Sequence, residues 1–78
     1  MPTVARIGPY RFFFFSNERS EPPHVHVQRD QTLAKFWLRP VALASSCGLP
    51  SHELRRIEEI VADNSNRFEE AWHEFFSS

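Results

Sequence analysis

A pair of prolines followed by alternating histidine and valine constrains the fold of this chain more than any other stretch. Residues 21–27 read Glu-Pro-Pro-His-Val-His-Val. Proline fixes the backbone φ angle and lacks an N–H donor, so the pair ends the segment before it. Side chains alternate between the two faces of a β-strand, so His24 and His26 share one face while Val25 and Val27 share the other. The stretch therefore predicts a strand that begins at His24 and has an imidazole face and an apolar face.

Strand and turn signals continue on both sides of this stretch. Segments rich in β-branched and aromatic residues predict strands, and Gly-Pro, Arg-Asp-Gln and Arg-Pro sequences predict the turns between them. The predicted strands span residues 3–7, 10–16, 24–28 and 33–38, and residues 41–45 form either a short edge strand or an opening turn of helix. Consecutive strands joined by short turns pair antiparallel, so we expect a meander.

The pattern becomes helical after Pro50. Apolar residues recur at helical spacing at positions 54, 57, 60 and 61, and a second apolar stripe occupies positions 68, 71, 72, 75 and 76. Asn66, with Glu69 three residues later, predicts the N-cap of the second helix. The chain is thus predicted to be a single α+β domain over residues 1–78. Its expected architecture is an antiparallel meander of four to five strands followed by two C-terminal helices packed on one face, a two-layer sandwich.

The core of so small a domain has to come from aromatic side chains. A chain of 78 residues buries only roughly 60% of the surface that its unfolded form exposes. Eight Phe, two Trp and one Tyr supply large apolar groups for this core. Four consecutive Phe at positions 12–15 place rings on both faces of their strand. An uncovered row of Phe13 and Phe15 would indicate a missing partner.

Cysteine use and hydropathy favour a cytoplasmic protein without a membrane segment. The single cysteine, Cys47, excludes an intramolecular disulfide and fits a reducing compartment. No signal peptide follows Met1, and no apolar run approaches the roughly 20 residues that span a bilayer.

Charge is unevenly distributed along the chain. Residues 1–47 carry six basic and three acidic groups, whereas residues 48–78 carry three basic and seven acidic groups. A basic half beside an acidic half favours either a basic face that meets phosphate or pairing between two copies. The net charge of −1 argues against a strong non-specific nucleic-acid binder, which would be clearly basic.

Several segments together resemble one protein family over nearly the whole chain. They are Tyr10-Arg-Phe-Phe-Phe-Phe-Ser-Asn-Glu, Glu21-Pro-Pro-His-Val-His-Val, Ala34-Lys-Phe-Trp-Leu and Glu53-Leu-Arg-Arg-Ile. The chain is similar in these segments to a family of small bacterial proteins catalogued as domain of unknown function 4160. Such proteins are often encoded beside a second small protein of unknown function (family 2442). The resemblance therefore implies one half of a two-gene, toxin–antitoxin-like module, with a small protein or a second copy as its partner.

The histidine pair is the main candidate for chemistry. One imidazole could take the 2′-hydroxyl proton of RNA while the other protonates the leaving oxygen. Lys35 or Arg11 would then stabilise the charge on phosphorus. On this hypothesis the catalytic residues are His24, His26 and Lys35.

The same two imidazoles could instead bind a metal ion. Two histidines on one strand face suit zinc, nickel, copper or iron, but such a site needs at least a third ligand. Glu21, His52 and Cys47 are the candidates, and none stands at a signature spacing. In the simplest interpretation His24 and His26 are half-exposed strand residues that hydrogen-bond to loop groups such as Glu21, and no cofactor is expected.

Further binding residues would surround the pair. Trp37, between Lys35 and Arg39, could stack on a nucleic-acid base while its neighbours contact phosphate, although a tryptophan in such a strand is more often part of the core. Arg11, Glu21, Trp37 and Arg39 are therefore the candidate binding residues.

These observations order three functional hypotheses. The first is a small interaction module of a two-gene bacterial system, with a protein partner or a homodimer. The second is a ribonuclease-like toxin that uses the histidine pair on RNA. The third is a small metal-binding protein.

Overall fold

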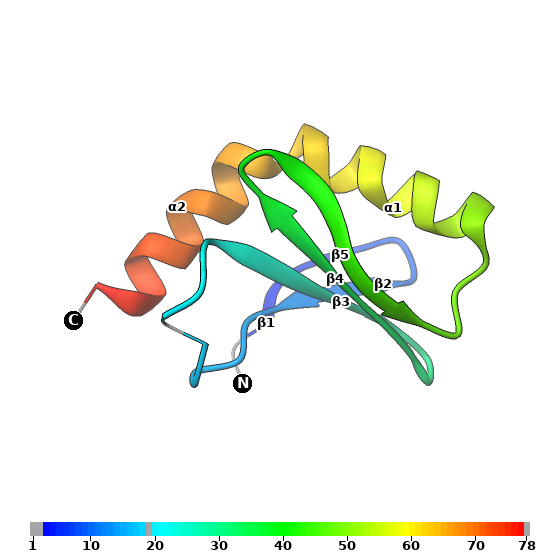
Figure 1. Cartoon of the computed structure of the whole chain (residues 1–78), viewed down its shortest axis with the longest axis horizontal. Coiled ribbons are helices and arrows are strands. Elements are labelled where there is room, and N and C mark those ends of the chain that lie inside the picture. Colours follow the sequence, from blue (N-terminus) through cyan, green and yellow to red (C-terminus); the bar gives the residue numbers. More distant parts are fainter. Residues whose placement is uncertain (1–2, 19, 78) are drawn as a thin grey trace.

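A five-stranded antiparallel sheet followed by two helices forms the structure, a computed structural model that describes residues 3–18 and 20–77 (Figure 1). The strands are neighbours in sequence order, β1-β2-β3-β4-β5, so the meander predicted from the turns is confirmed. The elements are β1 (Thr3–Ile7), β2 (Tyr10–Phe13), β3 (His24–Arg29), β4 (Thr32–Leu38), β5 (Val41–Cys47), α1 (Ser51–Asp63) and α2 (Ser65–Phe76).

Both helices lie across one face of the sheet, and the core fills the space between the two layers (Figure 1). Alternate strand residues point into it, and the apolar stripes of the helices meet them. The rings of Phe12 on β2 and Phe68 on α2 have centroids 5.0 Å apart and join the layers. The predicted two-layer α+β sandwich is therefore confirmed. Residues with fully buried side chains include Phe12, Phe14, Val25, Val27, Phe36, Ile57, Val61 and Phe68.

Three predicted boundaries are wrong. The second strand ends at Phe13 rather than at residue 16, because the chain leaves the sheet and turns Phe14 toward α2, where its ring packs on Trp72 at 5.4 Å. Residues 41–47 form a full edge strand. The second helix starts at Ser65 rather than after Asn66, because the carbonyl oxygen of Asn64 already accepts the helical hydrogen bond from the N–H of Phe68 at 2.9 Å.

The outer face of the sheet, opposite the helices, is crossed by side chains that the strand register places in rows. One row runs from Phe13 through His26 and Lys35 to Ser45, because each of these residues pairs directly with the next across neighbouring strands. The loop between β2 and β3 covers this row, and Phe13 is buried while Phe15 is half-buried. The aromatic row that could have signalled a missing partner is thus covered by the chain itself.

Two side chains differ from their expected environments. Trp37 lies half-buried on the outer face rather than in the core, since it pairs in register with His24. Cys47 is exposed at the end of the edge strand.

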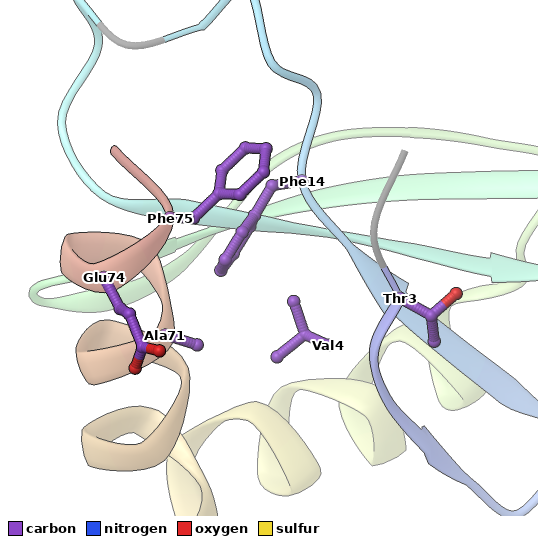
Figure 2. A pocket seen from close by; sticks show the side chains of 6 residues that line it. All are labelled: Thr3, Val4, Phe14, Ala71, Glu74 and Phe75. Carbon is purple, nitrogen blue, oxygen red and sulfur yellow. The ribbon is translucent and has the colours of Figure 1, made fainter. Parts of the chain in front are cut away.

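A hollow of about 310 Å³ opens between β1 and α2, where Val4, Phe14 and Phe75 give it an apolar lining (Figure 2). None of the candidate site residues borders it. Within residues 3–18 and 20–77, no helix is long and apolar enough to cross a membrane. The chemistry therefore has to be sought on the outer face of the sheet.

Candidate functional site

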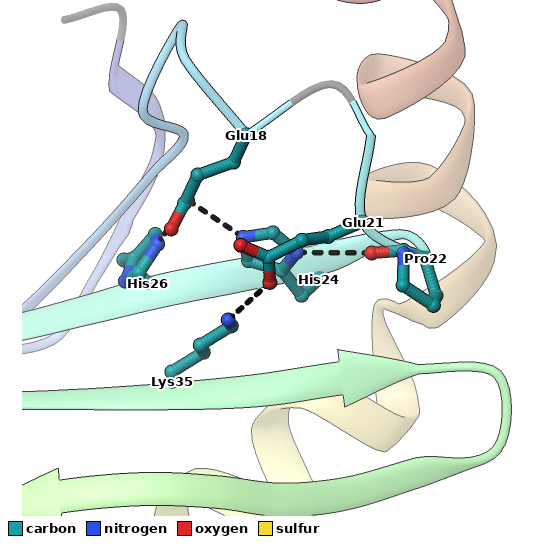
Figure 3. Close-up of polar contacts among 6 residues, drawn as sticks. All are labelled: Glu18, Glu21, Pro22, His24, His26 and Lys35. Carbon is teal, nitrogen blue, oxygen red and sulfur yellow. Dashed lines mark hydrogen bonds and ion pairs between the residues drawn. The ribbon is translucent and has the colours of Figure 1, made fainter.

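One carboxylate oxygen lies between the two histidines of β3. Oε1 of Glu18 lies 2.7 Å from Nε2 of His24 and 2.6 Å from Nε2 of His26 (Figure 3). Alternation along the strand aims both imidazoles at the outer face, and the loop before the strand returns over them with Glu18 pointing down. The three side chains form a cluster that we call the Glu18 triad.

The hydrogen bonds of His24 fix where its protons lie. Nδ1 of His24 is 2.9 Å from the backbone carbonyl oxygen of Pro22, and a carbonyl can only accept, so Nδ1 carries a proton. In neutral imidazole only one nitrogen is protonated, which leaves a lone pair on Nε2. This lone pair faces a carboxylate oxygen, so the 2.7 Å contact with Glu18 requires a cation between the two atoms, either a proton or a metal ion.

His26 lies in an aromatic environment at a cost in polar contacts. Its ring stacks on Phe13 at a centroid distance of 5.5 Å and meets the edge of Phe15 at 4.5 Å. Among the residues that the structure describes, Nδ1 of His26 is the one buried side-chain nitrogen or oxygen without a hydrogen-bond partner. An unpaired buried polar atom costs about 1–3 kcal/mol, and in a native structure such a cost calls for a functional explanation.

The charges of the triad follow from burial and from these contacts. Burial lowers the pKa of His26, and its hydrogen bond to Glu18 offsets only part of this effect. Burial would raise the pKa of Glu18, but the hydrogen bonds from His24 and His26 outweigh it and hold that pKa below its ordinary value. Glu18 is therefore a carboxylate at neutral pH, and His26 favours the neutral form that binds metals.

The donor atoms of the triad converge as metal ligands do. One ligand atom from each of Glu18, His24 and His26 lies within 4.8 Å of the other two. Two imidazoles and one carboxylate are the ligand set of several catalytic zinc sites and of mononuclear iron(II) centres. The bond from Nδ1 of His24 to the Pro22 carbonyl matches the outer-shell contact that orients most metal-binding histidines.

An ion pair borders the triad on the side of β4. Nζ of Lys35 lies 2.5 Å from Oε1 of Glu21 and 4.7 Å from the ring centroid of Trp37 (Figure 3). Lys35 pairs in register with His26, and both residues line a small hollow of about 150 Å³ that extends toward β5. A cation and a cavity thus lie directly beside the triad.

The candidate residues from the sequence divide into two groups. His24, His26, Lys35, Glu21 and Trp37 come together on the outer face. Arg11 lies next to this group: its guanidinium contacts the Phe13 ring at 4.6 Å and donates to Thr3 and Gln28. Arg39 is exposed and pairs with Glu69 of α2 at 3.1 Å, apart from the group.

The predicted surroundings of the histidine pair are wrong in two respects. Both residues are buried, with exposed fractions of 0% for His24 and 6% for His26, rather than half-exposed. The loop carboxylate that contacts them is Glu18 rather than Glu21, which pairs with Lys35. Glu18 carries no sequence signal, because its approach depends on how the loop folds back over β3.

The other two suggested ligands lie elsewhere. His52 is exposed on α1 and Cys47 is exposed at the end of β5, and neither belongs to the triad.

Comparison with known proteins identifies one family. The family model described as Domain of unknown function (DUF4160) matches residues 10–73. No curated protein and no solved structure matches the chain. The matched segment includes the whole Glu18 triad together with Glu21 and Lys35.

Proposed function

The chain belongs to the family described as domain of unknown function (DUF4160), and we propose that it is a metal-binding protein whose site is the Glu18 triad. Two imidazole nitrogens and one carboxylate oxygen would hold a single divalent transition-metal ion such as zinc or iron(II). This is the third of the hypotheses drawn from the sequence, and the geometry favours it over the other two.

The lone pair of His24 is the observation that carries the proposal. The Pro22 carbonyl takes the Nδ1 proton, so Nε2 faces the Glu18 carboxylate at 2.7 Å with nothing to donate unless the ring is charged. A buried charged imidazole has a large desolvation cost, and His24 is fully buried. A metal ion supplies the missing positive charge and leaves both imidazoles neutral.

The dimensions of the triad support the proposal. Metal–nitrogen and metal–oxygen bonds of roughly 2.0–2.2 Å set the ligand atoms about 3.4 Å apart in a tetrahedral site. The observed 2.7 and 2.6 Å contacts are shorter, so the carboxylate has to withdraw by less than about 1 Å. Glu18 stands on a loop and is partly exposed, whereas the histidines are held in the strand, so the movement falls on the residue free to make it.

The number of ligands favours a reactive site over a structural one. Structural zinc sites are closed by four protein ligands, whereas catalytic sites have three and keep a position open. The triad supplies three. A divalent ion held there would act as a Lewis acid on a group that enters the open position.

The proposal is tested by metal titration of the purified protein. Isothermal titration with Zn²⁺ and Co²⁺ should give one ion per chain. Glu18→Gln, His24→Gln and His26→Gln should each weaken binding by on the order of 100-fold or more, since loss of an outer-shell partner alone costs 10–100-fold.

The chain supplies matched controls for this titration. His52→Gln and His73→Gln remove exposed histidines of the helices and should leave the affinity unchanged. Far-UV circular dichroism checks that each variant is folded. Equal affinity in the wild type and in Glu18→Gln would refute the proposal.

The ribonuclease hypothesis receives less support from the geometry. Acid–base cleavage needs two imidazoles that reach the substrate from separate positions, whereas His24 is fully buried and both rings contact the same carboxylate oxygen. Total RNA from cells expressing the wild type or the His24→Ala/His26→Ala variant would test it. RNA loss that the variant abolishes would restore this hypothesis.

The interaction module remains a second candidate because one observation favours it. The edge strand β5 is largely exposed, and residues 41–47 contain neither a charge nor a proline that would block pairing. A second copy pairing antiparallel along β5 is the occupant we infer, in line with the homodimer expected from the charge distribution. Leu43 is exposed, and Leu43→Lys should convert a dimer to a monomer in sedimentation analysis. A wild type that sediments as a monomer would exclude this arrangement.

A further inference from the structure

The charge beside the Glu18 triad changes sign when a divalent ion enters. Without metal, the carboxylates of Glu18 and Glu21 outnumber the ammonium of Lys35 by one. With a divalent ion and neutral imidazoles, the same group carries one excess positive charge. A site buried to this degree favours a ligand that neutralises it, so the loaded centre calls for a monoanion.

The packing around the two imidazoles leaves one direction of approach. Phe13 and Phe15 flank the ring of His26, while Trp37 and Trp72 flank the ring of His24 at 5.6 and 4.8 Å. The side toward β4 and β5 is different, because it holds the hollow of about 150 Å³. A ligand of the metal would arrive through this hollow.

The lining of the hollow matches a short carboxylate. Lys35 and Ser45 face each other in register across β4 and β5, so an ammonium and a hydroxyl stand beside His26. An ammonium has three N–H donors, and the contact with Glu21 uses one of them. Leu33 and Ala34 add apolar lining suited to a short carbon chain. The volume equals on the order of five waters at ~30 Å³ each, which limits the ligand to a small one.

We propose that this hollow binds a short-chain monocarboxylate whose oxygen enters the open position of the metal, with Lys35 as its charge partner and Ser45 as a hydrogen-bond donor. This inference rests on the metal site proposed above. It adds the chemical class of the ligand and a specificity-determining residue, Lys35, the sole lysine of the chain. By linkage, the carboxylate and the metal strengthen each other's binding by the same factor.

The test uses protein loaded with Co²⁺, whose visible absorption responds to a change of ligand. Formate, acetate and propionate are titrated into the loaded wild type. We expect a saturable spectral change and an affinity that rises about fourfold for each methylene buried against Leu33. Metal-free protein, followed by calorimetry, should bind propionate at least tenfold more weakly.

Variants separate the role of Lys35 from that of the metal site. Lys35→Met should weaken propionate binding at least tenfold while leaving the Co²⁺ affinity within about threefold. Lys35→Arg restores the charge and should recover most of the binding, and Arg55→Met on α1 is the matched control for loss of a remote positive charge. Far-UV circular dichroism verifies the fold of each.

The outcomes distinguish the two proposals. If Co²⁺ binds the triad but carboxylates leave its spectrum unchanged, this inference is overturned and the metal site stands. Equal propionate affinity in wild type and Lys35→Met overturns the role of Lys35. Failure of Co²⁺ itself to bind removes the metal site and this inference together.

Discussion

The carbonyl oxygen of Pro22 lies 2.9 Å from Nδ1 of His24, so the turn that starts β3 also orients the histidine that follows it. The proline pair restricts the loop to extended conformations before any contact forms. The entropy of holding this carbonyl in place is therefore partly removed by the sequence itself.

Pro22→Ala keeps the carbonyl but frees the loop backbone. The unfolded chain gains conformational entropy, so the free energy of unfolding should fall by about 0.4–1 kcal/mol. Metal affinity should weaken several-fold, because the outer-shell contact to His24 becomes less ordered. Urea denaturation and Zn²⁺ titration measure the two effects. Tighter metal binding in Pro22→Ala would contradict the orienting role of the turn.

Glu18 should also stabilise the metal-free protein. Glu18→Ala leaves two buried imidazoles without their shared partner, and each unsatisfied group costs about 1–3 kcal/mol. We expect the free energy of unfolding in urea with a chelator to fall within or above this range. Glu58→Ala, on the exposed face of α1, serves as the control and should change stability by less than about 0.5 kcal/mol. Equal stability of both variants would show that the triad contacts contribute little.

The single tyrosine allows a direct measurement of one pKa. Burial of Tyr10, and then its hydrogen bond to Glu53, raises the pKa of the phenol above its ordinary value of 10.0. The folded state thus holds this proton more tightly than the unfolded state. Its contribution to stability is complete below pH 10 and is lost as the pH rises through the folded pKa.

An ultraviolet titration at 295 nm reports this group alone, because the chain has one Tyr. We expect a midpoint above pH 10 in the wild type. Glu53→Gln should lower the midpoint but leave it above 10, since burial is the larger cause. Glu58→Gln on the same helix should leave the midpoint unchanged. A wild-type midpoint at or below 10 would contradict the observed burial.

The fold was predictable because its signals are local. Turn residues and the alternation of residues 24–27 predict the hairpins, and the spacing of Phe68 and Trp72 predicts the buried stripe of α2. Errors fell where tertiary contacts decide, as at Phe14, which leaves β2 to pack on α2. A strand pattern alone cannot show where packing against a helix becomes more favourable than pairing.

The site was half predictable for the same reason. Strand alternation places His24 and His26 on one face, and pairing of β3 with β4 brings Lys35 beside them. The third member, Glu18, reaches the pair through the folded shape of a loop. Loop shape has no periodicity to read, so sequence reasoning selected the nearer carboxylate, Glu21, which binds Lys35 instead.

Both tryptophans of the chain contact His24, which makes their fluorescence a reporter of the triad. The ring centroids of Trp72 and Trp37 lie 4.8 and 5.6 Å from that of His24. An open-shell ion such as Co²⁺ quenches nearby indoles, whereas Zn²⁺ has a filled d shell. Co²⁺ bound at the triad should therefore quench both tryptophans with one-to-one stoichiometry, and Zn²⁺ should reverse the quenching by competition.

Variants assign this signal to the site. Trp37→Phe and Trp72→Phe should each retain quenching of the remaining indole, because either ring adjoins His24. Glu18→Gln should require on the order of 100-fold more Co²⁺, in proportion to its lost affinity, while His73→Gln at an exposed position of α2 should behave as the wild type. Quenching of equal strength in Glu18→Gln would mean that the ion binds elsewhere, since no other contact of these rings depends on that carboxylate.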